Sequence, residues 1–123
     1  MLKELLIDCC GIDAEGAKGL GEVLCVNTSL TRLDLADNSL LTKGVNCIAA
    51  GMSENVSIKD LNLTNTGIGV KSSEKLSDAL KANSTLEVLN LSNNQVRNHG
   101  TVKLAEALTS NHTLRSLDLG FNR

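Results

Sequence analysis

The sequence predicts a right-handed α/β solenoid of 28-residue repeats, in which a concave parallel sheet lines one side and helices cover the other. Three observations support this prediction. Closely similar phrases begin at residues 2, 30, 58, 86 and 114, with no insertion or deletion between them. Each phrase begins with alternating apolar and polar residues, a pattern typical of a half-buried strand. The first four phrases then continue with apolar residues at helical spacing.

The first half of each repeat predicts a strand followed by a turn. The pattern Leu-x-x-Leu-x-Leu-x-x-Asn appears as LTRLDLADN from Leu30 and as LEVLNLSNN from Leu86. Its three apolar positions are expected to point into the core, including Leu2 in the first repeat. The final position is expected to close the turn, because a side chain that both donates and accepts hydrogen bonds can satisfy the bending backbone. The residues of this turn column are Cys10, Asn38, Thr66, Asn94 and Asn122.

The second half of each repeat predicts a helix, because apolar residues recur there at spacings of three and four. The predicted helices cover residues 14–25, 42–53, 70–81 and 98–109. A column of small residues is expected to let the helices pack closely on the sheet: Gly21, Ala49, Ser77 and Ala105. Asparagine ends each helix and is expected there in a left-handed C-cap conformation: Asn27, Asn55, Asn83 and Asn111.

Composition limits the kind of protein that this chain can be. Its 123 residues suffice for one domain, and the core must be built from aliphatic side chains because Phe121 is the only aromatic residue. A net charge of −2 disfavours nucleic acid as a partner. No apolar run reaches membrane-spanning length, and no signal peptide opens the chain. We therefore expect a cytoplasmic domain with neither a nucleic-acid nor a membrane partner.

The reactive side chains form no catalytic or metal-binding pattern. Cys9 and Cys10 are adjacent, and no pair of cysteines or histidines has zinc-ligand spacing, so free thiols in a reducing compartment are expected. His99 and His112 have no aligned serine, cysteine or aspartate to activate. The Asn-x-Ser/Thr sequences keep step with the repeat, which favours a structural role over glycosylation. We expect no enzymatic activity, no metal and no cofactor.

The strand motif, the Asn or Cys at the turn and the Asn-x-Ser/Thr before each apolar strand start resemble leucine-rich-repeat proteins of the ribonuclease-inhibitor-like class. The resemblance covers essentially the whole chain, although Thr66 departs from the usual turn asparagine. The phrases GAKGLGEVL from Gly16 and GTVKLAEAL from Gly100 are similar to those of intracellular nucleotide-binding receptors of innate immunity. Related arrays occur in Ran GTPase-activating proteins and tropomodulins. The period predicts a single domain, 1–123, with four full repeats and a partial fifth, and the missing terminal caps favour a segment of a longer chain.

The outward strand positions predict a polar, mildly acidic binding surface on the concave face. Equivalent residues stack at the strand spacing of roughly 5 Å and so form rows. We expect the aspartates and asparagines of these rows to accept hydrogen bonds and the arginines to pair with acidic groups. Any solenoid also needs polar residues there for solubility, which is the alternative interpretation. The predicted partner-binding residues are Arg32, Asp34, Asp37, Asp60, Asn62, Glu87, Asn90, Arg115, Asp118 and Phe121.

These patterns favour an intracellular protein–protein interaction module whose partner, an unidentified protein, binds the concave face. Two alternatives remain open. Resemblance to the Ran activator implies a GTPase-activating regulatory module, and the repeats could instead be a structural spacer or autoinhibitory array in a larger receptor or cytoskeletal protein. The edge strands, which contain Leu5 and Leu117, have no covering layer, so self-association through these uncapped ends is a further expectation.

Overall fold

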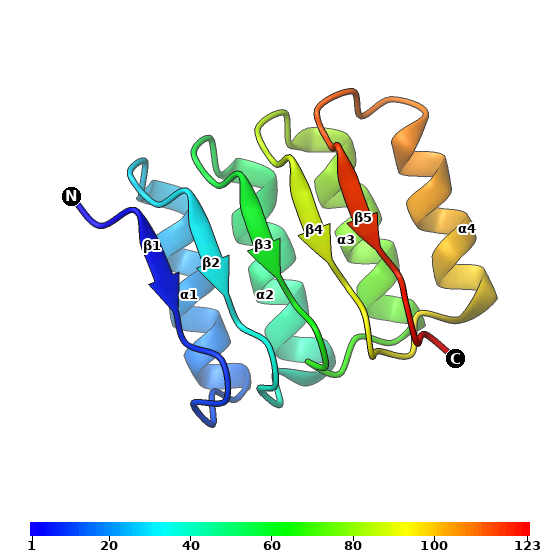
Figure 1. Cartoon of the computed structure of the whole chain (residues 1–123), viewed down its shortest axis with the longest axis horizontal. Coiled ribbons are helices and arrows are strands. Elements are labelled where there is room, and N and C mark those ends of the chain that lie inside the picture. Colours follow the sequence, from blue (N-terminus) through cyan, green and yellow to red (C-terminus); the bar gives the residue numbers. More distant parts are fainter.

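The computed structural model describes all residues, 1–123, as a single parallel sheet backed by helices (Figure 1). The strands pair in sequence order and are β1 (Glu4–Leu6), β2 (Arg32–Asp34), β3 (Asp60–Asn62), β4 (Val88–Asn90) and β5 (Ser116–Asp118). The helices alternate with them and are α1 (Ala14–Val26), α2 (Leu41–Glu54), α3 (Val70–Ala82) and α4 (Arg97–Leu108). The predicted α/β solenoid is confirmed, and each predicted helix agrees to within one residue at either end.

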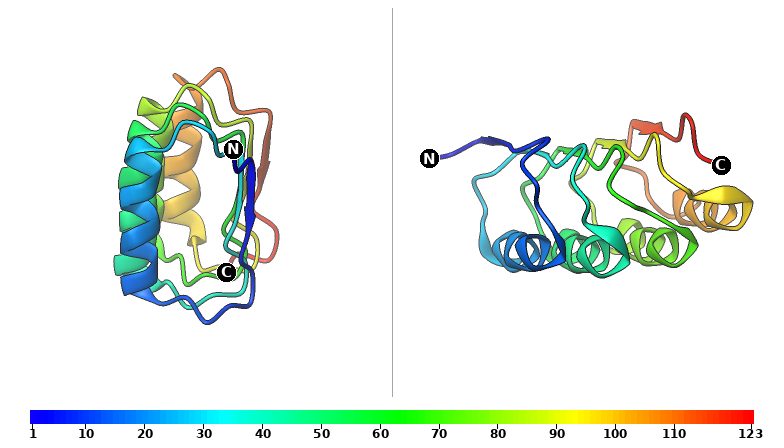
Figure 2. Two further views of the ribbon diagram at one scale, coloured as in Figure 1. Left: turned by 90° about the vertical axis from the view of Figure 1, so that its left-hand side faces the viewer. Right: turned by 90° about the horizontal axis from the view of Figure 1, so that it is seen from below.

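The strands and helices form two layers, with all helices on one face of the sheet (Figure 2). Each strand pairs with the next at the same repeat position, so that Leu33 lies opposite Leu61 and Leu61 opposite Leu89. Identical positions therefore lie at the same height, and the leucines of the middle repeats are fully buried. Leu5 and Leu117 in the outer strands are only partly buried, because one side of each outer strand is uncovered.

Leu2 is a correction to the predicted core, since 59% of its surface is exposed. It precedes β1, and a neighbouring strand lies on one side of β1 only. Val23 of α1 is likewise 44% exposed, whereas the equivalent Gly51 and Ala79 of the following helices are buried. In those helices this position faces the preceding helix. A side chain there needs a neighbour on that side to be buried.

The turn asparagines connect consecutive repeats, which confirms their predicted role. Asn94 Nδ2 donates hydrogen bonds of 3.0 Å to the carbonyls of Leu63, Leu91 and Ser92. Its Oδ1 accepts the backbone N–H groups of residues 66, 67 and 68 at 3.0–3.1 Å. The single buried side chain therefore satisfies polar groups in two successive repeats. Thr66 is too short for this and donates only to the carbonyl of Leu63, at 2.8 Å.

The asparagines after the helices do not take the predicted left-handed conformation. Asn83 is extended, with φ −81° and ψ 133°, and is 4% exposed. Its Oδ1 accepts the backbone N–H groups of Thr85 and Leu86, while its Nδ2 donates to the carbonyls of Met52 and Asn55 in the preceding repeat. Extended backbone places the amide where it bridges two repeats, and a left-handed residue would lose that bridge. Because Nδ2 of Asn55, Asn83 and Asn111 is bonded and these residues are buried, these three sites do not offer an accessible glycan acceptor.

The small-residue column packs against neighbouring helices and not against the sheet as predicted. Gly21 of this column, in α1, faces Gly51 of α2, which lies outside the column: a methyl group added to Gly51 would lie 2.5 Å from the carbonyl oxygen of Gly21. One added to Gly21 would overlap the carbonyl of Cys47. In the later repeats Ser77 of α3 donates a 2.6 Å hydrogen bond to the carbonyl of Lys103 in α4. Small side chains at this column therefore set how closely successive helices approach.

Two helical glycines separate this close contact from helix propensity. Gly51→Ala should lower the free energy of unfolding by about 2 kcal/mol, because the added methyl overpacks the contact between α1 and α2. Gly19→Ala, at a position of α1 with nothing within 4 Å, should raise it by about 0.5–1 kcal/mol through helix propensity alone. Urea unfolding followed by circular dichroism measures both values. A stabilising Gly51→Ala would show that the helices do not pack this closely.

The turn column predicts opposite effects at two positions. Asn94→Ala should lower the free energy of unfolding by about 3 kcal/mol, because several buried carbonyl and N–H groups lose their partner. Thr66→Asn should raise it by about 1 kcal/mol, because an asparagine there can reach the carbonyl of Leu35 and the N–H of Asn38, as Asn94 does with the equivalent groups of the next repeat. The same urea titrations test both variants. Equal small losses in the two variants would contradict the bridging role.

Candidate functional site

The face of the sheet opposite the helices is open, and most of the predicted partner-binding residues lie on it. They occupy the strands or the position directly before a strand: Arg32, Asp34, Asp60, Asn62, Glu87, Asn90, Arg115 and Asp118. The other two, Asp37 and Phe121, lie on the turns that follow β2 and β5. The structure thus divides the predicted set between the open sheet face and the edge at which the strands end.

Four charged side chains on the open face pair with one another across neighbouring strands. Arg32 Nε lies 3.5 Å from Asp60 Oδ2, and Lys59 Nζ lies 3.3 Å from Glu87 Oε1. Because these side chains are 38–53% exposed, each pair contributes little to stability. The pairs nevertheless cancel much of the local charge. The surface around β2–β4 is therefore mixed in charge, with its basic side chains already paired to acidic ones.

The central row of the open face consists of Asp34, Asn62, Asn90 and Asp118, which occupy the same register position in β2–β5. Each side-chain Oδ1 accepts the backbone N–H two residues further along its own chain, at 2.8–3.0 Å. These bonds hold the end of each strand in shape. They also determine the orientation of the two amides, because a backbone N–H can face only the oxygen.

This orientation corrects the role expected of Asn62 and Asn90. Their oxygens already accept a backbone N–H and, at 2.7 Å, the hydroxyl of Thr64 or Ser92. What they present to a partner is therefore the NH2 group, a donor. Asp34 and Asp118 each retain one carboxylate oxygen that makes no hydrogen bond in the structure. The row reads acceptor, donor, donor, acceptor across four strands.

The turns after the strands form a second row, in which every residue has positive φ. Asp37, Asn65, Asn93 and Phe121 have φ values of 51–56°, as does Cys9 in the first repeat. Aspartate and asparagine tolerate this left-handed conformation, whereas a bulky side chain pays about 1–2 kcal/mol for it. Phe121 does so although 82% of its surface is exposed.

Asp37 joins two neighbours of this turn row. It accepts a 2.8 Å hydrogen bond from Asn65 Nδ2 and lies 3.8 Å from Cys9 Sγ. Local desolvation, followed by the negative charges of Asp37 and Asp8, raises the pKa of the Cys9 thiol. All four cysteines are free thiols. A raised pKa keeps Cys9 protonated and therefore a poor nucleophile.

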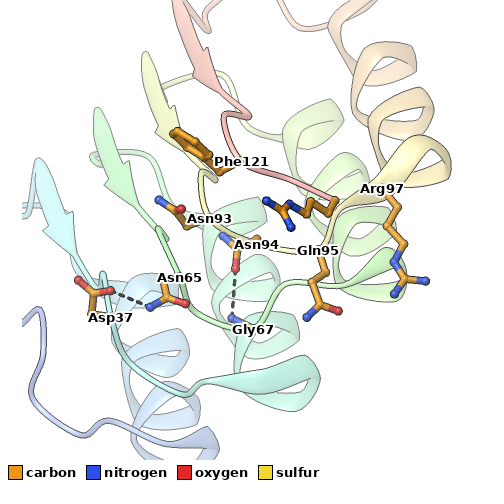
Figure 3. Close-up of a pocket in the computed structure, with 9 residues that line it drawn as sticks. Asp37, Asn65, Gly67, Asn93, Asn94, Gln95, Arg97 and Phe121 are labelled. Carbon is orange, nitrogen blue, oxygen red and sulfur yellow. Dashed lines mark hydrogen bonds between the residues drawn. The ribbon is translucent and has the colours of Figure 1, made fainter.

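A shallow cleft of about 820 Å³ lies along this turn edge between β2 and the C-terminal turn (Figure 3). Asp37 and Asn65 lie at one end of it, Arg97 lies at the other, and Phe121 stands above Asn93 between them. Arg123 also lines the cleft. Neither arginine has a carboxylate partner, since the ion pairs of the structure involve other residues.

Sequence reasoning missed most of this cleft. Arg97 occupies a helix-start position held by Asp13, Leu41 and Gly69 in the other repeats, so no column singles it out. Only the curvature of the turns brings it into the same cleft as Asp37. The open face and the cleft together offer hydrogen-bond donors, acceptors and unpaired charges, which suit the binding of polar groups. None of the helices is long and apolar enough to cross a bilayer.

Comparison with known proteins agrees with this architecture. The human protein "NACHT, LRR and PYD domains-containing protein 5" is 43% identical over 51 residues, which are 42% of this chain but 4% of that protein. The solved structure "Leiomodin-1 Actin-Binding Site 2 (ABS2)" is similar with a TM-score of 0.90 and 26% identity, covering 97% of this chain and 70% of that one. The tropomodulin C-terminal domain of Caenorhabditis elegans shares the fold, with a TM-score of 0.87, 16% identity and coverage of 98% and 74%.

The strand motif itself is matched by a family model. The model described as "Leucine Rich repeat" matches residues 1–21, 26–49, 82–105 and 110–123, which are more than half of the chain. The gap between the second and third matches includes Thr66, the departure from the turn asparagine. Similarity to these binding domains indicates a domain of the protein-interaction type. The 28-residue register, the buried asparagines and this match together establish that the chain belongs to the leucine-rich-repeat family.

Proposed function

We propose that this chain is an intracellular interaction module whose protein partner binds the open, concave face of the sheet. The central row of Asp34, Asn62, Asn90 and Asp118 carries the proposal. Its two inner positions present NH2 donors and its two outer positions present free carboxylate oxygens. Strands at a spacing of about 4.8 Å hold these groups in place, so binding costs little side-chain ordering.

The row supports a partner that offers carbonyl oxygens at its centre and basic groups on either side. Arg115 makes no ion pair and can contact an acidic group at the edge of the same face, near β5. The two ion pairs of β2–β4 would have to open before Arg32 or Asp60 could contact a partner. We therefore expect Asp34 and Asp118 to contribute more to partner binding than the residues of the two ion pairs.

Actin is the first protein to test as the partner. The similar solved structure of leiomodin-1 is, by its name, an actin-binding site, and 26% identity extends over 97% of this chain. The GTPase-activating and spacer functions remain alternatives. A single-turnover GTP hydrolysis assay with and without the chain tests the GTPase-activating function. The spacer function is favoured if the chain captures no partner, or if the surface variants bind a captured protein as well as the unchanged chain does.

The decisive measurement compares charge variants on the two faces. Asp34→Lys with Asp118→Lys should weaken binding of the partner about tenfold or more, because ammonium groups that repel the partner's basic groups replace two carboxylates that attract them. Actin co-sedimentation and capture from cytosolic extract, followed by titration of any captured protein, provide the affinities. A control with the same charge change on the helical side, Glu22→Lys with Asp78→Lys, should leave them unchanged.

A second pair of variants guards against misfolding. Asp34→Asn with Asp118→Asn keeps the side-chain oxygen that accepts the backbone N–H, and replaces the free, charged carboxylate oxygen with a neutral NH2 donor. It should weaken binding about threefold or more while leaving the urea midpoint nearly unchanged. If the face variants and the helical control bind a partner equally well, the open face is not the binding surface.

A further inference from the structure

We propose that the cleft along the turn edge binds an extended peptide segment of a partner, with a basic residue at the Asp37 end and an acidic residue at least about four positions away that Arg97 and Arg123 contact. This inference rests on the proposed interaction function, because it names one chemical feature of the partner. It concerns a different surface, however: the cleft lies on the turns that follow the strands, beside the open sheet face.

The two ends of the cleft carry opposite charges that the protein does not neutralise. Asp37 contacts only neutral groups, the Asn65 amide at 2.8 Å and the Cys9 thiol at 3.8 Å. Arg97 and Arg123 take part in no ion pair. Asp118 lies three residues before Phe121, but its Oδ1 accepts the N–H of Gly120 at 2.8 Å, and it does not line the cleft. A ligand with separated charges of both signs would satisfy both ends.

The floor between the two ends suits the polar backbone of a peptide. The side-chain amides of Asn93 and Gln95 make no hydrogen bond within the protein, although both line the cleft. Asn65 has used its NH2 on Asp37, so its oxygen remains as an acceptor. Asn94, in contrast, is consumed by structural hydrogen bonds. Free amides that both donate and accept match the N–H and C=O groups of an extended chain.

Phe121 adds the apolar part of the site. It is the only aromatic residue of the chain, it is 82% exposed, and it stands at the cleft with φ 54°. The other residues of the turn row that line the cleft are Asp37, Asn65 and Asn93, and aspartate and asparagine adopt positive φ readily. A phenylalanine there costs conformational energy without burying its ring in the core. Contact with an apolar side chain of a bound peptide would bury the ring, which folding leaves exposed, and so offset the cost of its backbone conformation.

Strand spacing sets the length of the segment. Asp37 follows β2 and Phe121 follows β5, so three spacings of about 4.8 Å, or about 14 Å, separate Asp37 from Phe121. An extended peptide advances about 3.3 Å per residue, so a segment that passes Phe121 and reaches Arg97 has its two charged residues at least about four positions apart. Because Asp37 would repel a continuous polyanion, this arrangement favours a peptide over a nucleic acid at the same arginines.

Two-dimensional ¹H–¹⁵N NMR of the labelled chain can test the proposal, because it detects the weak binding expected of a short peptide. The probes are the blocked heptapeptide Gly-Arg-Ser-Leu-Thr-Glu-Gly, the same residues in reverse order, and a version with glutamine at both charged positions. At least one charged peptide should shift the amide signals of Asp37, Asn65, Asn93, Arg97 and Phe121, with a Kd of about 1 mM or below. The order that binds gives the direction of the segment.

Variants then assign the charges. Arg97→Glu with Arg123→Glu should weaken binding of the charged peptide about tenfold. A peptide that carries arginine in place of its glutamate should bind this double variant more tightly than it binds the unchanged protein. Lys18→Glu with Lys81→Glu makes the same charge change at two exposed positions of α1 and α3, away from the cleft; it is the matched control and should have no effect. Phe121→Asn should weaken binding severalfold while raising the urea midpoint, because asparagine adopts positive φ more easily.

Several outcomes would overturn the inference. They are no shifts at 5-fold the expected Kd, equal binding of the neutral peptide, an equal loss in the Lys18→Glu, Lys81→Glu control, or tighter binding of a single-stranded oligonucleotide than of any peptide. The charge variants of the open face should retain peptide binding. If the cleft fails while those face variants still lose the partner protein, only the cleft assignment is wrong. If the face variants fail while the cleft binds, the proposed sheet-face interaction is wrong.

Discussion

Buried asparagine side chains are the interaction on which this structure depends. The strands are only three residues long, so much of each repeat is turn and loop whose backbone groups would otherwise lack partners in the interior. Asn83 and Asn94 each satisfy polar groups of their own repeat and of a neighbouring one. Hydrophobic burial is non-directional, so by itself it fixes the alignment of one layer with the next only loosely. The asparagines give that penalty, because any shift breaks several buried hydrogen bonds at once.

The register that the asparagines maintain also shapes the surface. Equivalent positions lie side by side at every level, so the surface is built of columns: paired charges at Arg32–Asp60 and Lys59–Glu87, then amides and carboxylates, then the positive-φ turns. A change in one repeat alters one element of a row and leaves its neighbours in place. This allows a binding surface to vary along the array while the core remains the same, which is a general property of repeat proteins. Phe121 is such a local variation: it ends the turn row, in which the preceding repeats have Cys9, Asp37, Asn65 and Asn93.

The departures between expectation and structure share one cause. Asn62 and Asn90 were expected to accept hydrogen bonds, but local backbone N–H groups occupy their oxygens. The helix-ending asparagines were expected in a left-handed conformation, but bridging to the preceding repeat holds them extended. The small column was expected at the sheet, and it instead lies between α1 and α2, where Gly51 faces Gly21. In each case the residue type was correctly singled out, and a contact with another part of the chain decided what it does.

The sequence by itself determined the period, the order of the elements, the buried leucine columns and the turn positions, because these follow from patterns that repeat within one chain and need no knowledge of distance. It also singled out most residues of the open face. Only the tertiary structure decided which charges cancel, which way the amides point, and that Arg97 lies in one cleft with Asp37. These properties depend on side-chain geometry between residues in different repeats. Neither periodicity nor composition records which atoms of two stacked repeats face each other.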